Sequence, residues 1–223
     1  MIQTATILTP DATRMERLPE GVRLGELERK LRIGDLVFIR IPWGPFRQIA
    51  TLTGTWTNHV GIVSDIGPTG AVIAESRFPI SCRTSFTHFV RRSECGRVAV
   101  SRLPRPLSDP EVRRLQQAVA GRLGRVYDTG FNLSSRRQFC SRFVHEVLLE
   151  ATGEELGRVI TFEELLADNA GTDLRLWKFW YFGRIPWTRL TITPASLYLN
   201  EALRVVFDGA FNNRRKLGRC TKN

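Results

Sequence analysis

The chain has 223 residues, of which 42% are hydrophobic and 25% are charged. That balance excludes a disordered or low-complexity protein, and the length suits one domain with a sizeable core. Lys and Arg number 33 against 22 acidic residues, which gives a formal net charge of +11, so contact with an anionic surface has to be considered. The basic residues are scattered as pairs without a nucleic-acid-binding motif, so we do not expect a nucleic-acid partner.

The chain divides by composition into three parts. Residues 1–30 are weakly periodic and are interpreted as an N-terminal leader, residues 31–207 as one domain, and residues 208–223 as a basic tail. The start of the chain lacks the apolar core of a secretory signal, and no apolar run approaches the roughly 20 residues that span a bilayer. We therefore expect a cytoplasmic protein.

Along the domain, a run of predicted strands is followed by amphipathic helices and then by two further strands. β-branched and aromatic residues bounded by turn residues predict strands at residues 31–41, 59–66, 70–76, 97–103, 175–182 and 203–209. Helices are predicted after the Ser108 cap, from Cys140 to a stop at Gly153, and after a capping box formed by Thr161 and Glu164. The pattern predicts an α+β fold.

Two of these strands form a predicted hairpin. Residues 59–66 and 70–76 flank the turn Gly67-Pro68-Thr69-Gly70, which favours antiparallel pairing. His59 opens the first strand and Glu75 ends the second. Because those two ends are neighbours in an antiparallel pair, the two side chains should meet if they share a face of the sheet.

Cys140 heads the apolar stripe of its helix, since the residues that follow it at helical spacing are apolar. A helix N-terminus favours the thiolate form of a cysteine, and its free backbone amides can hold an oxyanion. The same position equally suits a core residue, because free cysteines are among the most buried residues. The helix alone therefore leaves a nucleophile and a core cysteine as alternatives.

A nucleophilic thiol needs a base from elsewhere in the fold. His145 lies five residues after Cys140, roughly 140° around the helix, and so faces the wrong way. His59, with Glu75 to orient its ring, completes a set in which Cys140 is the nucleophile, His59 the general base and Glu75 the orienting acid. Cys82, His88 and Cys95 match no common metal-site spacing, so no metal and no cofactor are expected.

Five segments in this order, GDLVFIRI, TNHVGIVS, VIAESR, VYDTGFNL and QFCSRFVHEVL, resemble the YiiX/YebB-like group of circularly permuted papain-fold (NlpC-type) cysteine hydrolases. LWKFWYFGRIPW and TPASLY look closest to YebB-type members. The resemblance covers roughly residues 31–200 and implies the roles given above to Cys140, His59 and Glu75, with the histidine before the cysteine as in the permuted order. It also implies that Tyr127 is an active-site aromatic residue. Tyr127 and Ser141 are therefore the candidates for oxyanion or substrate binding.

The resemblance implies a circularly permuted papain-like fold, with an antiparallel, partly barrel-like sheet packed against the nucleophile helix. The expected reaction is hydrolysis of an amide, ester or thioester through a thioester on Cys140. The substrate is expected to be peptide-like or a lipid acyl group, and an anionic surface is a second candidate partner. The alternatives are a non-catalytic lipid- or peptide-binding module of the same fold and a basic nucleic-acid-binding protein.

Overall fold

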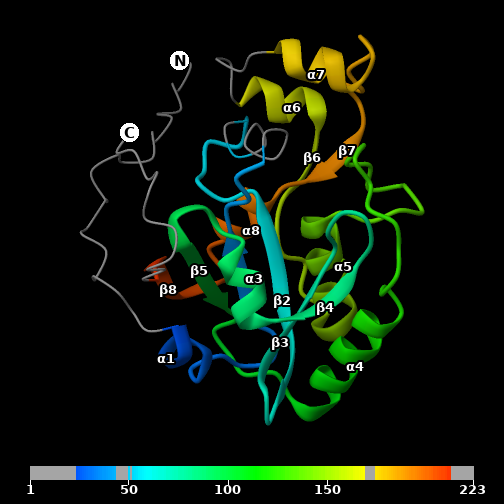
Figure 1. The fold of residues 1–223 in the computed structure, drawn as a ribbon. Coiled ribbons are helices and arrows are strands. Elements are labelled where there is room, and N and C mark those ends of the chain that lie inside the picture. The colour runs from blue at the N-terminus through cyan, green and yellow to red at the C-terminus, as the bar shows by residue number, and fades with distance from the viewer. Residues whose placement is uncertain (1–23, 44–49, 51, 169–173, 212–223) are drawn as a thin grey trace, which may run out of the picture.

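The computed structural model describes residues 24–43, 50, 52–168 and 174–211, and its centre is one six-stranded antiparallel sheet (Figure 1). In the order in which they lie side by side, the strands are β4 (Cys82–Ser85), β3 (Gly70–Glu75), β2 (His59–Gly67), β1 (Leu36–Ile39), β5 (Arg97–Arg102) and β8 (Arg204–Ala210). The sheet is open, with β4 and β8 at its edges, so the α+β class is confirmed and the sheet is not a closed barrel.

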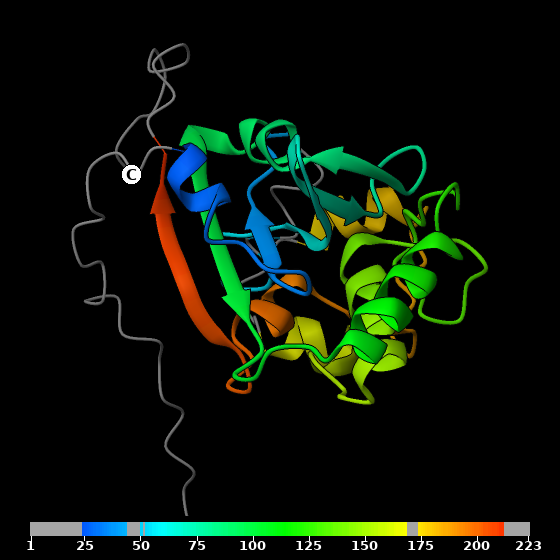
Figure 2. The same ribbon diagram turned by 90° about the horizontal axis from the view of Figure 1, so that it is seen from below.

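Helices cover both faces of this sheet (Figure 2). On one face lie α4 (Asp109–Ala120), α5 (Cys140–Thr152) and α8 (Pro194–Tyr198), and on the other lie α1 (Leu24–Glu28) and α3 (Phe86–Arg91). Strand β1 is buried along its whole length, with Leu36 and Phe38 in the first core and Val37 and Ile39 in the second. A strand covered on both faces explains a continuous apolar run where a half-exposed strand would alternate.

Local sequence signals set the ends of the main helices. Helix α4 begins with a capping box between Ser108 and Glu111, and α5 ends at Gly153, whose φ of 76° is the left-handed conformation favoured by glycine. Helix α5 packs against α4 and β2. The predicted hairpin is confirmed as β2 and β3, and the strand predicted at 97–103 as β5.

A smaller unit closes the end of the sheet near Cys140 (Figure 1). It consists of α6 (Phe162–Ala167), α7 (Leu174–Trp180) and a two-stranded antiparallel sheet of β6 (Val159–Thr161) and β7 (Leu190–Ile192). In the main sheet, a 3-10 turn (Glu94–Gly96) precedes β5. The strand predicted at 175–182 is wrong. Its aromatic composition suggested a strand, but Trp177 and Tyr181 lie one helical turn apart and both contact Phe162.

The ends of the domain stay a prediction. The proposed leader lies mostly outside the described residues, but its last part forms α1, whose Leu27 is buried in the core between the sheet and α3. The first residues of the proposed tail, 208–210, form the end of β8. The part of the tail after Phe211 lies outside the described residues. Within the described ranges, no helix has the length and apolar character needed to cross a bilayer.

Candidate active site

His59 and Glu75 meet at one end of the sheet, as the hairpin predicts. His59 lies opposite Ile39 on the face covered by α3, and Glu75 follows Ile73 by two residues on the same face. The distance from His59 Nε2 to Glu75 Oε2 is 2.6 Å, and both side chains are buried. The shared face is what lets this buried pair form.

Phe89 of α3 supports the imidazole ring. The two rings are stacked, with their centroids 5.6 Å apart. The close approach of α3 depends on Gly61, because a Cβ atom there would lie only 2.9 Å from Phe89 Cε2 and 2.5 Å from Ile73 Cγ2. A glycine two residues after the histidine therefore allows the packing that fixes the plane of the His59 ring.

Cys140 reaches the same point from the opposite face of the sheet. It is the first residue of α5 and packs in the core that this helix shares with α4 and β2. Its thiol interacts with the His59 ring, and because His59 Nε2 is held by Glu75, Nδ1 is the ring nitrogen left for the thiol. Thiol, imidazole and carboxylate thus form one chain across the end of the sheet.

The charges of Cys140, His59 and Glu75 favour an ion pair of thiolate and imidazolium. Burial alone would lower the pKa of His59, but the negative charge and hydrogen bond of Cys140, together with Glu75, raise it to about 9. Burial alone would raise the pKa of Cys140. The effect of burial is outweighed by the interaction with His59 and by the backbone N–H groups of Val60 and Ser141. Together these groups hold the pKa of the thiol below its usual range.

Arg92 completes the charge balance and was missed by the sequence reasoning. Its Nη2 donates to Glu75 Oε1 at 2.7 Å and to Oε2 at 2.8 Å, and its guanidinium lies over the Phe89 ring. Burial alone would raise the pKa of Glu75, but His59 and Arg92 lower it. The carboxylate therefore stays ionised and can hold the imidazolium in place.

Tyr127 lies on the other side of the thiol. Its hydroxyl lies beside Cys140 and interacts electrostatically with the side chain and the backbone N–H of that residue. Burial and, next, the negative charge of Cys140 raise the pKa of Tyr127 well above its ordinary value, so the hydroxyl keeps its proton. The Ser141 hydroxyl is engaged elsewhere, because it donates to Ile192 O at 2.7 Å. Ser141 therefore faces the site through its backbone N–H alone.

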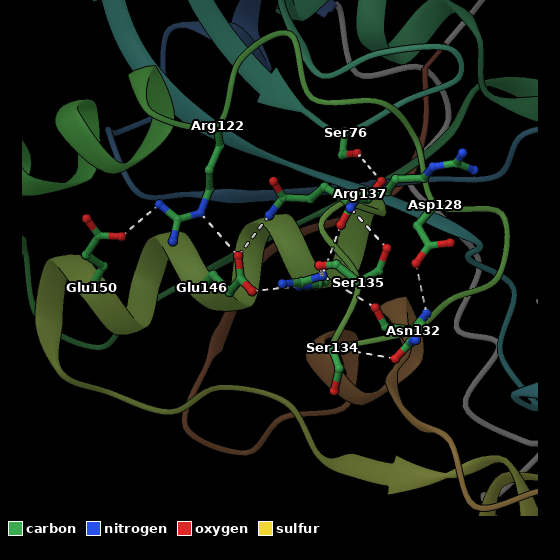
Figure 3. A network of polar contacts seen from close by, with 11 residues as sticks. Ser76, Arg122, Asp128, Asn132, Ser134, Ser135, Arg137, Glu146 and Glu150 are labelled. Atoms are coloured by element: carbon green, nitrogen blue, oxygen red, sulfur yellow. Dashed lines mark hydrogen bonds and ion pairs between the residues drawn. The ribbon is translucent and has the colours of Figure 1, made fainter.

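A polar network braces the segment that leads into Cys140 (Figure 3). Arg142, in the first turn of α5, donates to the backbone carbonyls of Ser135 and Arg137 and pairs with Glu146 at 2.6 Å. Ser76, the residue after Glu75, donates to the carbonyl of Gln138 at 2.9 Å. These bonds tie the β3 end to the start of α5, and so fix the carboxylate relative to the thiol.

Two pockets open on the two sides of Tyr127. One contains Cys140 and is lined mainly by apolar side chains, among them Phe131, Phe139, Phe162, Leu165, Trp177 and Ile192. The other contains His59 and two arginines, Arg77 and Arg92. The nucleophile and the base therefore face different kinds of surface.

Residues 30–207 match the family described as "permuted papain-like amidase enzyme, YaeF/YiiX, C92 family". This chain belongs to that family. It is 26% identical to the uncharacterized protein YiiX of Escherichia coli strain K12 over 165 residues, which cover 74% of this chain and 80% of YiiX. The crystal structure of the metalloprotein yiiX from E. coli O157:H7 matches with a TM-score of 0.72 at 23% identity, covering 80% of this chain and 98% of that one.

These comparisons confirm the YiiX-like, permuted papain-like family and its fold. The family description as an amidase supports a cysteine hydrolase with a peptide-like substrate. The NlpC-type assignment, the closeness to YebB-type members and a cytoplasmic location stay predictions. So do the roles of the individual site residues, although the structure brings Cys140, His59, Glu75 and Tyr127 together.

One expectation is corrected by the comparison. The structural neighbour is described as a metalloprotein, which contradicts the expectation that no metal takes part, and we withdraw it. In the part of this chain that the structure describes, no group of three or more His, Cys, Asp or Glu side chains could hold a metal ion. The side chains of the described residues therefore do not fit a metal centre.

The other histidines and the second described free thiol are not part of the group formed by Cys140, His59 and Glu75. His145 is buried, and its Nδ1 bonds the carbonyl of Leu156 at 2.7 Å, which makes it a satisfied core residue. His88 is exposed on α3. Cys82 is free and half-buried on β4, opposite Glu75 in the register of β3 and β4, and it offers an internal comparison for the reactivity of Cys140.

Proposed function

We propose that this protein is a cysteine amidase in which Cys140 is the nucleophile, His59 the general base and acid, and Glu75 the orienting carboxylate. The observation that carries the proposal is the buried group in which the imidazole interacts with both the thiol and the carboxylate, with 2.6 Å between His59 Nε2 and Glu75 Oε2. Three groups linked in this order perform the roles that nucleophilic acyl transfer requires.

The first step forms a thioester. The Cys140 thiolate attacks the carbonyl carbon of the substrate, a C–S bond forms, and the carbonyl electrons move to oxygen. The Tyr127 hydroxyl, which stays protonated, can donate to that oxygen, with the backbone N–H groups at the start of α5 as further donors. When the C–N bond breaks, the proton on His59 Nδ1 passes to the departing amine.

The second step releases the acid. His59, now neutral, removes a proton from a water molecule, and the hydroxide formed attacks the thioester carbonyl. The C–S bond breaks, the carboxylic acid departs, and the thiolate and imidazolium are restored. Glu75 and Arg92 hold the ring during both proton transfers. Esters and thioesters can follow the same path with an alcohol or thiol as the leaving group.

The ion pair sets the expected pH dependence of turnover. Activity requires the thiolate, whose pKa lies below the usual range, and the imidazolium, whose pKa is about 9. Turnover should therefore persist below neutral pH, and it should fall as the pH rises through about 9 because His59 loses the proton that the leaving group needs.

The experiment that tests the proposal is a substrate screen with trapping of the acyl-enzyme. The wild type, Cys140→Ala and the matched control Cys82→Ala are incubated with peptide amides, muropeptides, acyl esters and acyl thioesters. Acid quenching followed by peptide mapping should locate an acyl group on Cys140. Turnover should vanish in Cys140→Ala and persist in Cys82→Ala. Binding of these ligands without acylation or turnover in the wild type would instead indicate a non-catalytic binding module.

A further inference from the structure

The cleft on the His59 side has an unbalanced positive charge. It encloses about 330 Å3, and its lining includes His59, Tyr127, Arg77 and Arg92 together with the apolar side chains of Trp43 and Phe78. None of the described residues that line it is acidic. A cleft of this size can hold a small organic group, and its charge favours an anionic one.

Arg77 is the source of that charge. In the catalytic chain, the two cations His59 and Arg92 are balanced by the two anions Glu75 and Cys140. Arg77 follows β3 by two residues and is half-buried, and among the described residues it has neither a hydrogen-bond nor an ion-pair partner. A half-buried guanidinium without a protein partner is suited to bind a ligand anion, and its planar fork matches a carboxylate.

The proposed reaction decides which part of the substrate enters this cleft. His59 must deliver its proton to the leaving amine, so the amine portion has to lie over the imidazole. His59 lines the cleft that contains Arg77, whereas Cys140 lines the apolar pocket beyond Tyr127. The acyl portion therefore extends toward the apolar pocket and the amine portion toward Arg77.

We propose that the leaving group carries a carboxylate, which Arg77 binds. This inference rests on the proposed function. The substrate class is then an amide formed on an amino acid, such as an N-acyl amino acid or the last peptide bond of a chain with a free C-terminal carboxylate. Hydrolysis of such a bond releases a free amino acid. The neutral amide or ester of the same compound lacks the group that Arg77 recognises.

The first test needs no substrate. The rate of alkylation of Cys140 is measured with iodoacetate, which is an anion, and with neutral iodoacetamide, in the wild type, Arg77→Gln and the control Arg113→Gln, an exposed arginine on α4. One charge near the thiol should favour the anion about threefold or more at low salt. The ratio of the two rates should fall by that factor in Arg77→Gln and stay at the wild-type value in Arg113→Gln.

The second test uses two probes that differ in one charge, hippuryl-phenylalanine and hippuryl-phenylalaninamide. The wild type should prefer the carboxylate form by about tenfold or more in kcat/KM, since a charge-assisted bidentate contact contributes at least that factor. The preference should disappear in Arg77→Gln and return in part in Arg77→Lys.

The outcomes separate the two proposals. If Cys140 reacts rapidly with both alkylating agents but Arg77→Gln leaves their ratio unchanged, the carboxylate site is refuted while the activated thiol stands. If Cys140 reacts no faster than Cys82 with either agent, the proposed function fails, and the carboxylate site fails with it.

Discussion

The structure makes a quantitative prediction for the variant His59→Gln. The rise in the pKa of His59 from 6.5 to about 9 corresponds to about 3 kcal/mol, at roughly 1.4 kcal/mol for each pKa unit. The same interaction that favours the imidazolium lowers the pKa of the Cys140 thiol, because each charge stabilises the other. Glutamine keeps a polar side chain but cannot carry the proton. What remains in the variant is the effect of burial, which raises a thiol pKa.

The assay is alkylation of Cys140 by iodoacetamide between pH 5 and 9.5, with the modified residue located by peptide mapping. Each rate is divided by the plateau rate of the same protein at high pH, which removes differences in intrinsic nucleophilicity between thiolates of different pKa. A thiol with a pKa of about 8.5 or above is at most about 1% ionised at pH 6.5. The variant should therefore retain about 1% of its plateau rate at pH 6.5, whereas the wild type should retain a large share.

Two controls accompany this measurement. His88→Gln changes an exposed histidine on α3 and should leave the pH profile of Cys140 as it is in the wild type. Cys82, which is also free, is mapped in the same samples, and its alkylation rate should be the same in the wild type and in His59→Gln. If Cys140 in the wild type also titrates near pH 8.5 and His59→Gln does not move its midpoint, the thiolate–imidazolium reasoning is refuted.

Three further substitutions test two groups around the pair and one buried ion pair elsewhere in the fold. Arg92→Gln removes the guanidinium that holds Glu75, so kcat should fall about tenfold while KM changes little, because Glu75 then orients His59 less firmly. Tyr127→Phe removes the hydroxyl beside Cys140, and kcat/KM should fall about tenfold or more through loss of an oxyanion donor, while Cys140 is still alkylated at pH 6.5. Asp35→Asn breaks a buried two-bond ion pair with Arg102, at 2.6 and 2.7 Å; urea unfolding should show a loss of about 3 kcal/mol, and a loss below about 1 kcal/mol would contradict a structural role for this pair.

The central chain of groups could be predicted because its signals are local. A turn-rich tetrapeptide between two β-rich runs predicts the hairpin, and antiparallel pairing then brings His59 and Glu75 together. The position of Cys140 at the head of an apolar stripe predicts the helix and the place of its thiol. These inferences use only the periods of strands and helices, which the sequence carries directly.

The surrounding cations could not be predicted in this way. Arg92 was one of several arginine pairs, and its role depends on the packing of α3 against Phe89 and β3, a tertiary contact with no local pattern. Arg77 differs from other surface arginines only in the cleft that it lines. The error at α7 has a different cause, because aromatic residues favour strands by composition, while the spacing of Trp177 and Tyr181 favoured the helix that forms.

The thiol lies in the hydrophobic core on one face of the sheet, and the imidazole stacks on Phe89 of the core on the other face. Their hydrogen bond forms only when both cores are packed, so any variant that loosens either face should separate the pair before the chain unfolds completely. Rapid alkylation of Cys140 at acid pH would then serve as a one-residue reporter of native packing on both faces. Such a reporter would make it possible to rank the integrity of variants, storage conditions or bound compounds before any substrate has been identified.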